Sequence, residues 1–392
     1  MKRVNTLAIL AFILLIPPEA SAQYPSFAAF TPPSKEYVVQ SDLIEVTNLP
    51  KVPAQGGRGI CYAASAAVVL TAENCLKLHE DCTRYTPDKI FSPYGLVKPF
   101  GEEDSRSHEP LADEGGSAIN ALNYAAYDAF GNPSLECSSK DKTMPDFATS
   151  DDGGVREYTM WNQVYNIYKN LTNTAQKTDF NCQTCIEDFF NTHQTEFSTL
   201  KKIFPNIKEQ SVSFLRLMRE PTYRDFVVKL TVPIKCHRVA NKVWLENAGK
   251  VDVAVYPPAG GDTTTPGSSG KETGQNKKPG HGNYKEAIAV IKTVLNSGRP
   301  LVLEGICLDK NTKGKKCLVL HTVVISGSKT LCDKKNQCLD VLKVINSWGD
   351  SWQKEVNDGW VQAKPLLDST HYAEYMMGWL SDKAQAGQED SR

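Results

Sequence analysis

Cys61 is the residue of this chain whose type and surroundings best suit chemistry. It follows a glycine-rich turn and opens an alanine-rich stretch, 62–70, that is typical of a helix. A helix N-terminus carries a partial positive charge, so we expect the thiol there to ionise more readily to the nucleophilic thiolate. The side-chain amide of Gln55, just upstream, can stabilise the negative charge that forms when an acyl group is attacked. The pattern predicts acyl transfer by a cysteine nucleophile.

Two partners that such a nucleophile needs lie far downstream. His321 lies in an apolar, β-branched run, 317–325, that is typical of a buried strand. A second strand-like run, 339–345, leads directly into Asn346-Ser-Trp-Gly. An imidazole within hydrogen-bond reach activates the thiol, and a third group holds the imidazole in one tautomer. We therefore expect His321 and Asn346 to complete a catalytic set with Cys61.

The order of these groups along the chain resembles that of the papain family of cysteine peptidases. The family's flanking patterns are matched as well, by Gln-Gly-x-x-Gly-x-Cys-Tyr-Ala around the nucleophile and by the pair Gly115-Gly116. The resemblance extends from about Gln55 to Ala363 and is concentrated in these blocks. It implies an α+β, papain-like fold of two lobes, one helical and one β-barrel-like, with the active-site cleft between them. The chain's order of elements, helices first and strands later, independently favours an α+β protein.

Carried over residue by residue, the resemblance implies a role for each matched position. Cys61 would be the nucleophile and His321 its acid/base partner. Asn346 would orient the imidazole, and Trp348 would line the site and shield the hydrogen bond between them from water. The side chain of Gln55 and the backbone N–H of Cys61 would form the oxyanion hole.

The same resemblance implies where a substrate lies. Gly115 and Gly116 would pair with its extended backbone, because a side chain at either position would block that close approach. Trp352 corresponds to a further aromatic residue on the wall of the site. No cofactor or metal is implied, and the expected partners are a peptide or protein substrate and a proteinaceous inhibitor.

Each of these features also has a structural interpretation. A buried cysteine is often a small core hydrophobe, His321 can be a hydrogen-bonded core histidine, and an Asn-Ser pair or a glycine pair is common in turns. Three other functions stay open: a catalytically inactive papain-like peptide-binding protein, another thiol acyl-transfer enzyme such as a transglutaminase or cell-wall amidase, and a disulfide-stapled adhesion module. The occurrence of all the motifs in one order favours the peptidase.

The first residues have the pattern of an export signal. Lys2 and Arg3 form a basic start, 7–16 an apolar core, and Ala-Ser-Ala22 a cleavage site. No later segment reaches the ~20 apolar residues that a membrane span needs. We therefore expect a secreted or periplasmic protein, cleaved after Ala22, with no membrane anchor in the mature chain.

Cysteine counting agrees with an oxidising compartment. The chain has 11 cysteines, an odd number, so at least one thiol stays free, and Cys61 is the natural candidate. Spacing predicts three disulfides, Cys75–Cys82, Cys307–Cys317 and Cys332–Cys338. The remaining cysteines, whose pairing the sequence leaves open, are Cys137, Cys182, Cys185 and Cys236. Cys182-Gln-Thr-Cys185 is alternatively a redox pair, or a zinc site with Cys236 and His237.

We divide the chain into a signal peptide and two lobes. The ranges are 1–22 for the signal, 23–245 for the N-terminal and helical lobe with a cysteine-bearing helical insertion at about 132–240, 246–380 for the β-rich lobe with a flexible loop at 257–282, and 381–392 for a polar tail. Between Gln23 and Cys61 there is no room for a long inhibitory propeptide. Without residues 1–22 the net charge is (44−2)−(45−1) = −2, which offers no electrostatic reason to bind nucleic acid.

Overall fold

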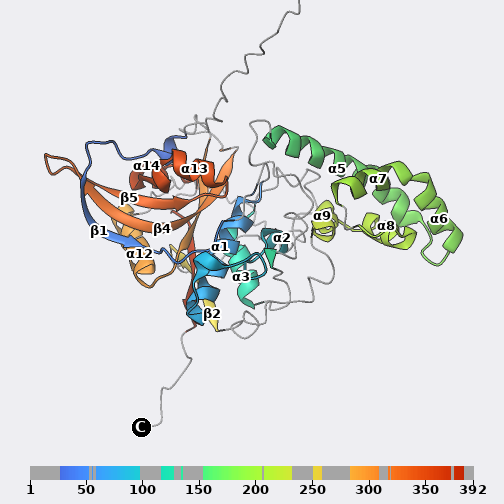
Figure 1. The fold of residues 1–392 in the computed structure, drawn as a ribbon, viewed down its shortest axis with the longest axis horizontal. Helices are drawn as coiled ribbons and strands as arrows, with labels where there is room; N and C mark the ends of the chain where they lie inside the picture. The colour runs from blue at the N-terminus through green and yellow to red at the C-terminus, as the bar shows by residue number, and fades with distance from the viewer. Residues whose placement is uncertain are drawn as a thin grey trace, which may run out of the picture.

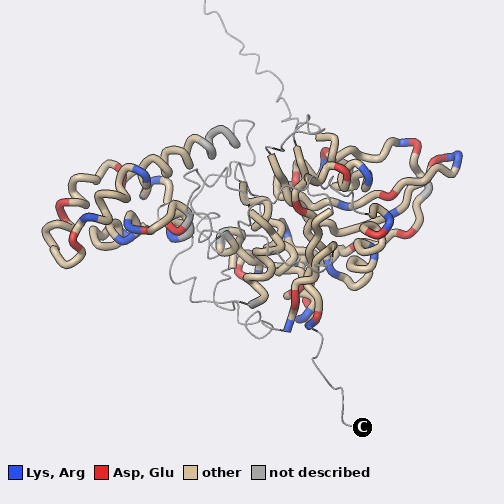
Figure 2. Tube along the Cα trace, turned by 180° about the vertical axis from the view of Figure 1, so that it is seen from behind, with Lys and Arg blue, Asp and Glu red and all other residues tan. Residues whose placement is uncertain are grey.

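The computed structural model describes residues 27–52, 55, 59–97, 116–127, 134–135, 153–204, 207–231, 250–257, 283–308, 317, 319–371 and 375–383. Several sequence predictions lie outside these ranges: the signal peptide 1–22, Gly115, Cys137, Cys236, His237, nearly all of the loop 257–282 and most of the tail 381–392. The described chain combines helices with an antiparallel sheet (Figure 1). Basic and acidic residues are interspersed along it (Figure 2), which fits a net charge of −1 for the whole sequence.

The sheet has seven strands in the order β2-β7-β3-β4-β5-β6, with β1 paired to β4 off this path. Its strands are β1 (Val39–Glu45), β2 (Val251–Tyr256), β3 (Leu301–Cys307), β4 (Leu320–Cys332), β5 (Cys338–Ile345), β6 (Trp360–Gln362) and β7 (Met377–Asp382). Every pairing is antiparallel. The two strand-like runs around the candidate histidine and before the candidate asparagine are thus β4 and β5, which pair directly.

Both faces of the central strands are covered. Successive side chains of a strand point to opposite faces of a sheet. Val302 of β3 and Val324 of β4 belong to one buried hydrophobic cluster, whereas their neighbours Leu303 and Val323 belong to a second. The first cluster continues into α1, α3 and α5–α9, and the second into α12 and α14. This double burial explains why β3 is buried at every residue.

The helices form three sets around the sheet. Beside it lie α1 (Cys61–Leu78), α2 (Pro93–Val97) and α3 (Ala118–Tyr127). A bundle extending away from it contains α5 (Gly153–Lys177), α6 (Gln183–Thr192), α7 (Gln194–Ile203), α8 (Ser211–Met218) and α9 (Tyr223–Thr231) (Figure 1). The others are α12 (Tyr284–Asn296), α13 (Asp350–Glu355) and α14 (Ala363–Asp368), with short 3-10 turns η1 (Ala28–Phe30), η2 (Cys82–Arg84) and η6 (Asn357–Gly359). No helix of the described chain has the length and apolar character to cross a membrane.

Helix α1 lies in the middle of the molecule and is buried from Cys61 to Cys75. It contacts α2 and α3 on one side and β3, β4 and β7 on the other. Such a helix has no solvent-facing stripe, so its apolar residues are spread around it rather than gathered on one face. Its many alanines allow close approach of the sheet. The residue that opens this helix is therefore held by packing on all sides.

A buried ion cluster fixes α1 against the sheet. Glu73, whose side chain is 1% exposed, receives two hydrogen bonds from the guanidinium of Arg299, Nε–Oε2 at 2.8 Å and Nη2–Oε1 at 3.1 Å. The same Nη2 lies 2.9 Å from Oδ2 of Asp382 at the end of β7, and Lys77 also contacts Asp382. A bidentate guanidinium–carboxylate pair fixes orientation as well as distance. The cluster thus joins α1, the segment before β3 and the last strand.

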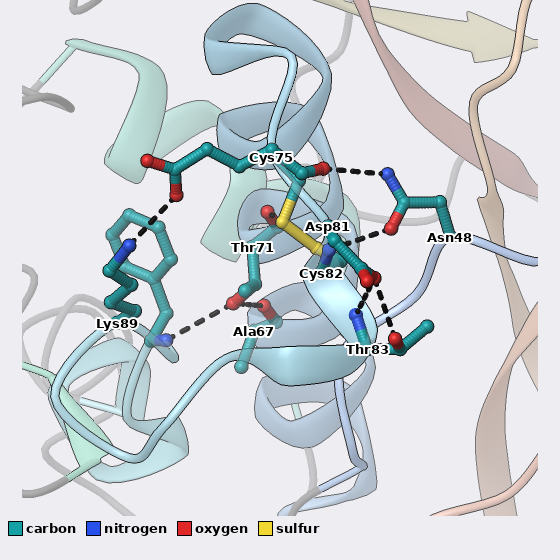
Figure 3. Close-up of a disulfide and its surroundings, with 10 residues drawn as sticks. Asn48, Ala67, Thr71, Cys75, Asp81, Cys82, Thr83 and Lys89 are labelled. Carbon is teal, nitrogen blue, oxygen red and sulfur yellow. Dashed lines mark hydrogen bonds and ion pairs between the residues drawn. A yellow bond between two sulfur atoms is a disulfide. The ribbon is translucent and has the colours of Figure 1, made fainter.

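The three disulfides predicted from spacing are confirmed: Cys75–Cys82, Cys307–Cys317 and Cys332–Cys338. Figure 3 shows the first, which closes the C-terminal end of α1, where Asn48 accepts a hydrogen bond from the Cys82 backbone at 2.6 Å. Cys182 and Cys185 are bonded to each other. This pairing removes them from the suggested zinc site. Among the described residues, Cys61 is the free cysteine.

Candidate active site

Cys61 is the first residue of α1, as predicted, but it is more deeply buried than the sequence suggested. It is only 6% exposed. Burial raises the pKa of its thiol, and the negative charge of Glu304 adds to this, while hydrogen bonds with Thr322 and with the backbone of Tyr62 act in the opposite direction. The expectation of a readily ionised thiol is therefore wrong for the free protein, because desolvation outweighs the favourable helix terminus.

His321 and Asn346 form a buried pair. They are 3% and 2% exposed, and Nε2 of the imidazole lies 3.0 Å from Oδ1 of the amide. An amide oxygen only accepts hydrogen bonds, so the neutral ring carries its proton on Nε2 and keeps Nδ1 as its basic nitrogen. Burial lowers the pKa of His321 to about 4, and the bond to Asn346 opposes that shift. The imidazole is thus a neutral base over most of the pH range.

Aromatic rings enclose the imidazole. Trp348 stacks on His321 with ring centroids 4.5 Å apart and an interplanar angle of 27°, and Phe30 meets the same ring edge-on at 6.3 Å. Phe30 also contacts Trp348 and Trp352, while Phe27 lies 5.5 Å from Trp348. The two phenylalanines were not predicted; their i, i+3 spacing in an otherwise polar, Pro-rich segment was the available signal. The rings keep water from the His321–Asn346 bond.

The nucleophile lies against the strand that bears the histidine. The thiol hydrogen-bonds at Thr322, the residue after His321, and the hydroxyl of Ser65, one turn along α1, donates to the Thr322 carbonyl at 3.2 Å. Among the described residues, the thiol forms no hydrogen bond with the imidazole itself. Thr322 was not predicted, because only the packing of α1 on β4 brings it to the site. The structure thus places Cys61 and His321 on two elements that pack together, α1 and β4. The thiol is bonded to Thr322, the neighbour of His321 in the strand, and not to His321 itself.

Gln55 lies beside the turn that follows Asn346. Its backbone N–H donates to the carbonyl of Ser347 at 2.9 Å, and the hydroxyl of Ser347 donates to its side-chain oxygen Oε1. This second bond fixes the amide so that its NH₂ group is on the side away from Ser347. The orienting contact of Ser347 was not predicted from the sequence.

Gly116 lies at the entrance to α3 and is exposed on one side. A Cβ at this position would lie 2.5 Å from Cζ of Tyr62, inside the ring's contact distance. Tyr62 is 1% exposed and directly follows the nucleophile, so it has no room to yield. Only glycine fits here, and the glycine backbone is thereby held against the ring of Tyr62, the residue after Cys61. The predicted pairing of Gly115 with a substrate lies outside the described residues.

Because the pKa of Cys61 is raised and that of His321 is lowered, we expect a wide bell-shaped pH profile of kcat/KM. Activity requires neutral His321, so it should fall as pH decreases through about 4. The raised pKa of the Cys61 thiol keeps that proton available for the leaving amine, so the alkaline limb should lie above the ordinary thiol range. The apparent pKa values of both limbs describe the interacting pair of Cys61 and His321 and not either residue alone. An acid limb at the ordinary histidine value of 6.5 would contradict the burial argument.

Similarity of the chain to known proteins is seen at the level of structure. No family model matches it, and no curated protein matches it in sequence. Among solved structures it is similar to xylellain, a cysteine protease from Xylella fastidiosa, with 13% identity, coverage of 90% of this chain and 91% of that chain, and a TM-score of 0.38. At this level the likeness assigns no role to any residue. The function has to be inferred from the geometry around Cys61.

Proposed function

We propose that this chain is an exported, papain-like cysteine peptidase that hydrolyses peptide bonds through a thioester on Cys61. The observation that carries the proposal is the buried hydrogen bond of 3.0 Å between His321 and Asn346. Trp348 stacks on the imidazole of this pair, and the residue after His321, Thr322, contacts the thiol. An imidazole with an oriented tautomer and a free basic nitrogen is what a thiol nucleophile requires.

The reaction begins from a neutral pair. Substrate binding draws the Cys61 thiol away from Thr322 toward Nδ1 of His321. The imidazole takes the thiol proton while Sγ attacks the carbonyl carbon of the scissile bond, and Asn346 accepts the Nε2–H of the resulting imidazolium. The C–N bond then breaks, the imidazolium protonates the leaving amine, and the acyl group stays on Sγ. A water molecule, deprotonated by the same imidazole, hydrolyses the thioester and restores the thiol.

The developing oxyanion requires donors that are fixed before the reaction. The backbone N–H of Cys61 belongs to the first turn of α1, where amides have no intrahelical acceptor. The NH₂ group of Gln55, oriented by Ser347, supplies the second donor. Gly116 contributes its exposed backbone to the substrate.

The proposal extends to the architecture. The lobe 23–245 bears Cys61 on α1, the lobe 246–380 bears His321 and Asn346 on the sheet, and a cleft between them admits the peptide. The insertion at about 132–240, to which α5–α9 belong, restricts or recruits substrates. An inhibitor protein restrains its activity. Export through the signal peptide 1–22 to the periplasm or exterior is supported by the disulfides, which persist in oxidising compartments.

The contacts of the imidazole favour a peptidase over the alternatives. Transglutaminases and amidases more often orient the histidine with a carboxylate or a second histidine, whereas His321 is bonded to the neutral amide of Asn346. A peptide-binding or adhesion protein has no need of a buried free thiol beside a tautomer-fixed imidazole. Digestion of a mixed peptide library tests the assignment. Wild-type protein should generate new amino termini, and Cys61→Ala should generate none; release of ammonia or cross-linked peptides without chain cleavage would contradict it.

The Gln55–Ser347 contact leads to a prediction about the oxyanion hole. Gln55→Ala should reduce kcat about 100-fold with little change in KM, because the donor acts on the transition state. Ser347→Ala should reduce kcat about 10-fold, since it acts only by orienting Gln55. Steady-state kinetics of both variants and of the double variant check this. The double variant should be no slower than Gln55→Ala; additive losses would show that Ser347 acts independently.

A further inference from the structure

Glu304 is a buried carboxylate that the proposed reaction does not use. It is 4% exposed and lies on β3, next to the strand of the catalytic histidine. The register between β3 and β4 shifts between Leu303 and Ile306, and Gly305 has a φ of 71°. A bulge of this kind changes which face of the sheet the following side chains meet. Glu304 points to the same face as Val302, the face that α3 covers, and the bulge after it places Ile306 on the opposite face.

The carboxylate binds the N-terminus of α3. Its Oε1 accepts the backbone N–H of Ile119 at 2.7 Å, and the hydroxyl of Ser117 lies 3.0 Å and 3.2 Å from its two oxygens. The same hydroxyl oxygen accepts the backbone N–H of Asn120 at 3.2 Å. The first amides of a helix have no partners within it and form its positive end, so a carboxylate there is stabilised by charge as well as by hydrogen bonds. Burial raises the pKa of Glu304, and these donors lower it.

These contacts link Glu304, through Ser117, to Gly116 and thus to the residues around the site. Ser117 adjoins Gly116, whose other side rests on the ring of Tyr62. Tyr62 adjoins the nucleophile, and Ile306 of β3 pairs with His321 of β4. The glycine is therefore held from two directions, by the helix that bears the thiol and by the strand next to the imidazole.

We propose that Glu304 is a positioning residue that sets the substrate-binding backbone of Gly116 relative to Cys61 and His321. This inference rests on the proposed peptidase function, because it assigns Gly116 to the substrate. Glu304 touches no reacting atom, so its effect is on substrate alignment and thus on KM. Misplacement of a binding group by about 1 Å is enough to change catalysis up to about 100-fold.

The test uses two substitutions of the full-length oxidised protein. Glu304→Ala removes every contact with α3, and Glu304→Gln keeps an oxygen that can accept from Ile119. We expect Glu304→Ala to raise KM for peptide substrates at least about 10-fold with kcat within about 3-fold of wild type, and Glu304→Gln to raise it about 2- to 3-fold. Alkylation of Cys61 by iodoacetamide should not slow, because this small reagent does not use the glycine backbone.

A matched control separates positioning from general stability. Glu45→Gln alters a carboxylate on β1 that pairs with Lys343 at 2.7 Å, and it should leave KM unchanged. If Glu304→Ala does not fold, Ser117→Ala, which removes the hydroxyl between the carboxylate and Asn120, should raise KM instead. A wild-type KM in the folded Glu304 and Ser117 variants overturns the inference while leaving the peptidase intact. Absence of cleavage by the wild-type protein overturns both, and the two failures are thereby distinguished.

Discussion

Replacing Cys61 by alanine is expected to abolish peptide hydrolysis while leaving the fold unchanged. The thiol supplies the bond-forming atom, and the oxyanion donors and binding groups alone provide only residual catalysis, so kcat should fall by about 10⁴-fold or more. The substitution removes a small buried atom and adds none, and alanine suits the helix that Cys61 opens. Hydrolysis of a fluorogenic peptide measures the loss, and circular dichroism with thermal melting measures the fold.

Ser65→Ala is the matched control for this variant. Ser65 is on the same buried face, one turn along α1, and donates to the Thr322 carbonyl at 3.2 Å. Removing its hydroxyl should reduce activity far less than removing the thiol, because it takes no part in bond formation. Retention of most activity by Cys61→Ala would refute the assignment of the nucleophile.

Replacing Glu73 by alanine should cause the largest loss of stability. Among the described residues, the variant leaves the guanidinium of Arg299, whose side chain is 14% exposed, with the more exposed Asp382 as its remaining ion-pair partner. Breaking a buried ion pair from one side costs about 3–5 kcal/mol of unfolding free energy, because an uncompensated charge stays in the interior. The midpoint of guanidinium unfolding measures the change.

Two further variants make the stability prediction specific. Lys364→Ala breaks an exposed pair with Asp368 and should leave the midpoint unchanged. The double variant Glu73→Leu, Arg299→Leu should recover much of the loss of Glu73→Ala, because neither buried charge remains. Equal midpoints for Glu73→Ala and Lys364→Ala would show that the cluster does not fix α1.

The parts of the site that depend on local sequence motifs were predicted from the sequence. The strands around His321 and before Asn346, the helix that begins at Cys61 and three disulfides across short loops all follow from residues close in the chain. The raised pKa of the Cys61 thiol was not predicted, because a helix start is visible in the sequence and the depth at which it is buried is not. Sequence reasoning recognised the favourable dipole and missed the larger desolvation.

The residues that were missed act across long separations. Thr322 reaches the thiol only because α1 packs on β4, and Phe30 reaches His321 because the N-terminal segment folds back over the sheet. Glu304 reaches the first amides of α3 because that helix packs against β3, far away in the sequence. The Cys182–Cys185 pairing was left open because four cysteines allow several connectivities.

Labelling with a peptidyl epoxide, read by intact mass and by mapping of unreduced digests, tests the central claim most directly. The reagent needs both a peptide-binding site and an activated thiol. The mechanism predicts a single adduct on Cys61, intact disulfides, and loss of the adduct in His321→Ala although iodoacetamide still modifies that variant. An adduct on another residue, no adduct on folded wild-type protein, or Cys61 found in a disulfide of active protein would contradict it.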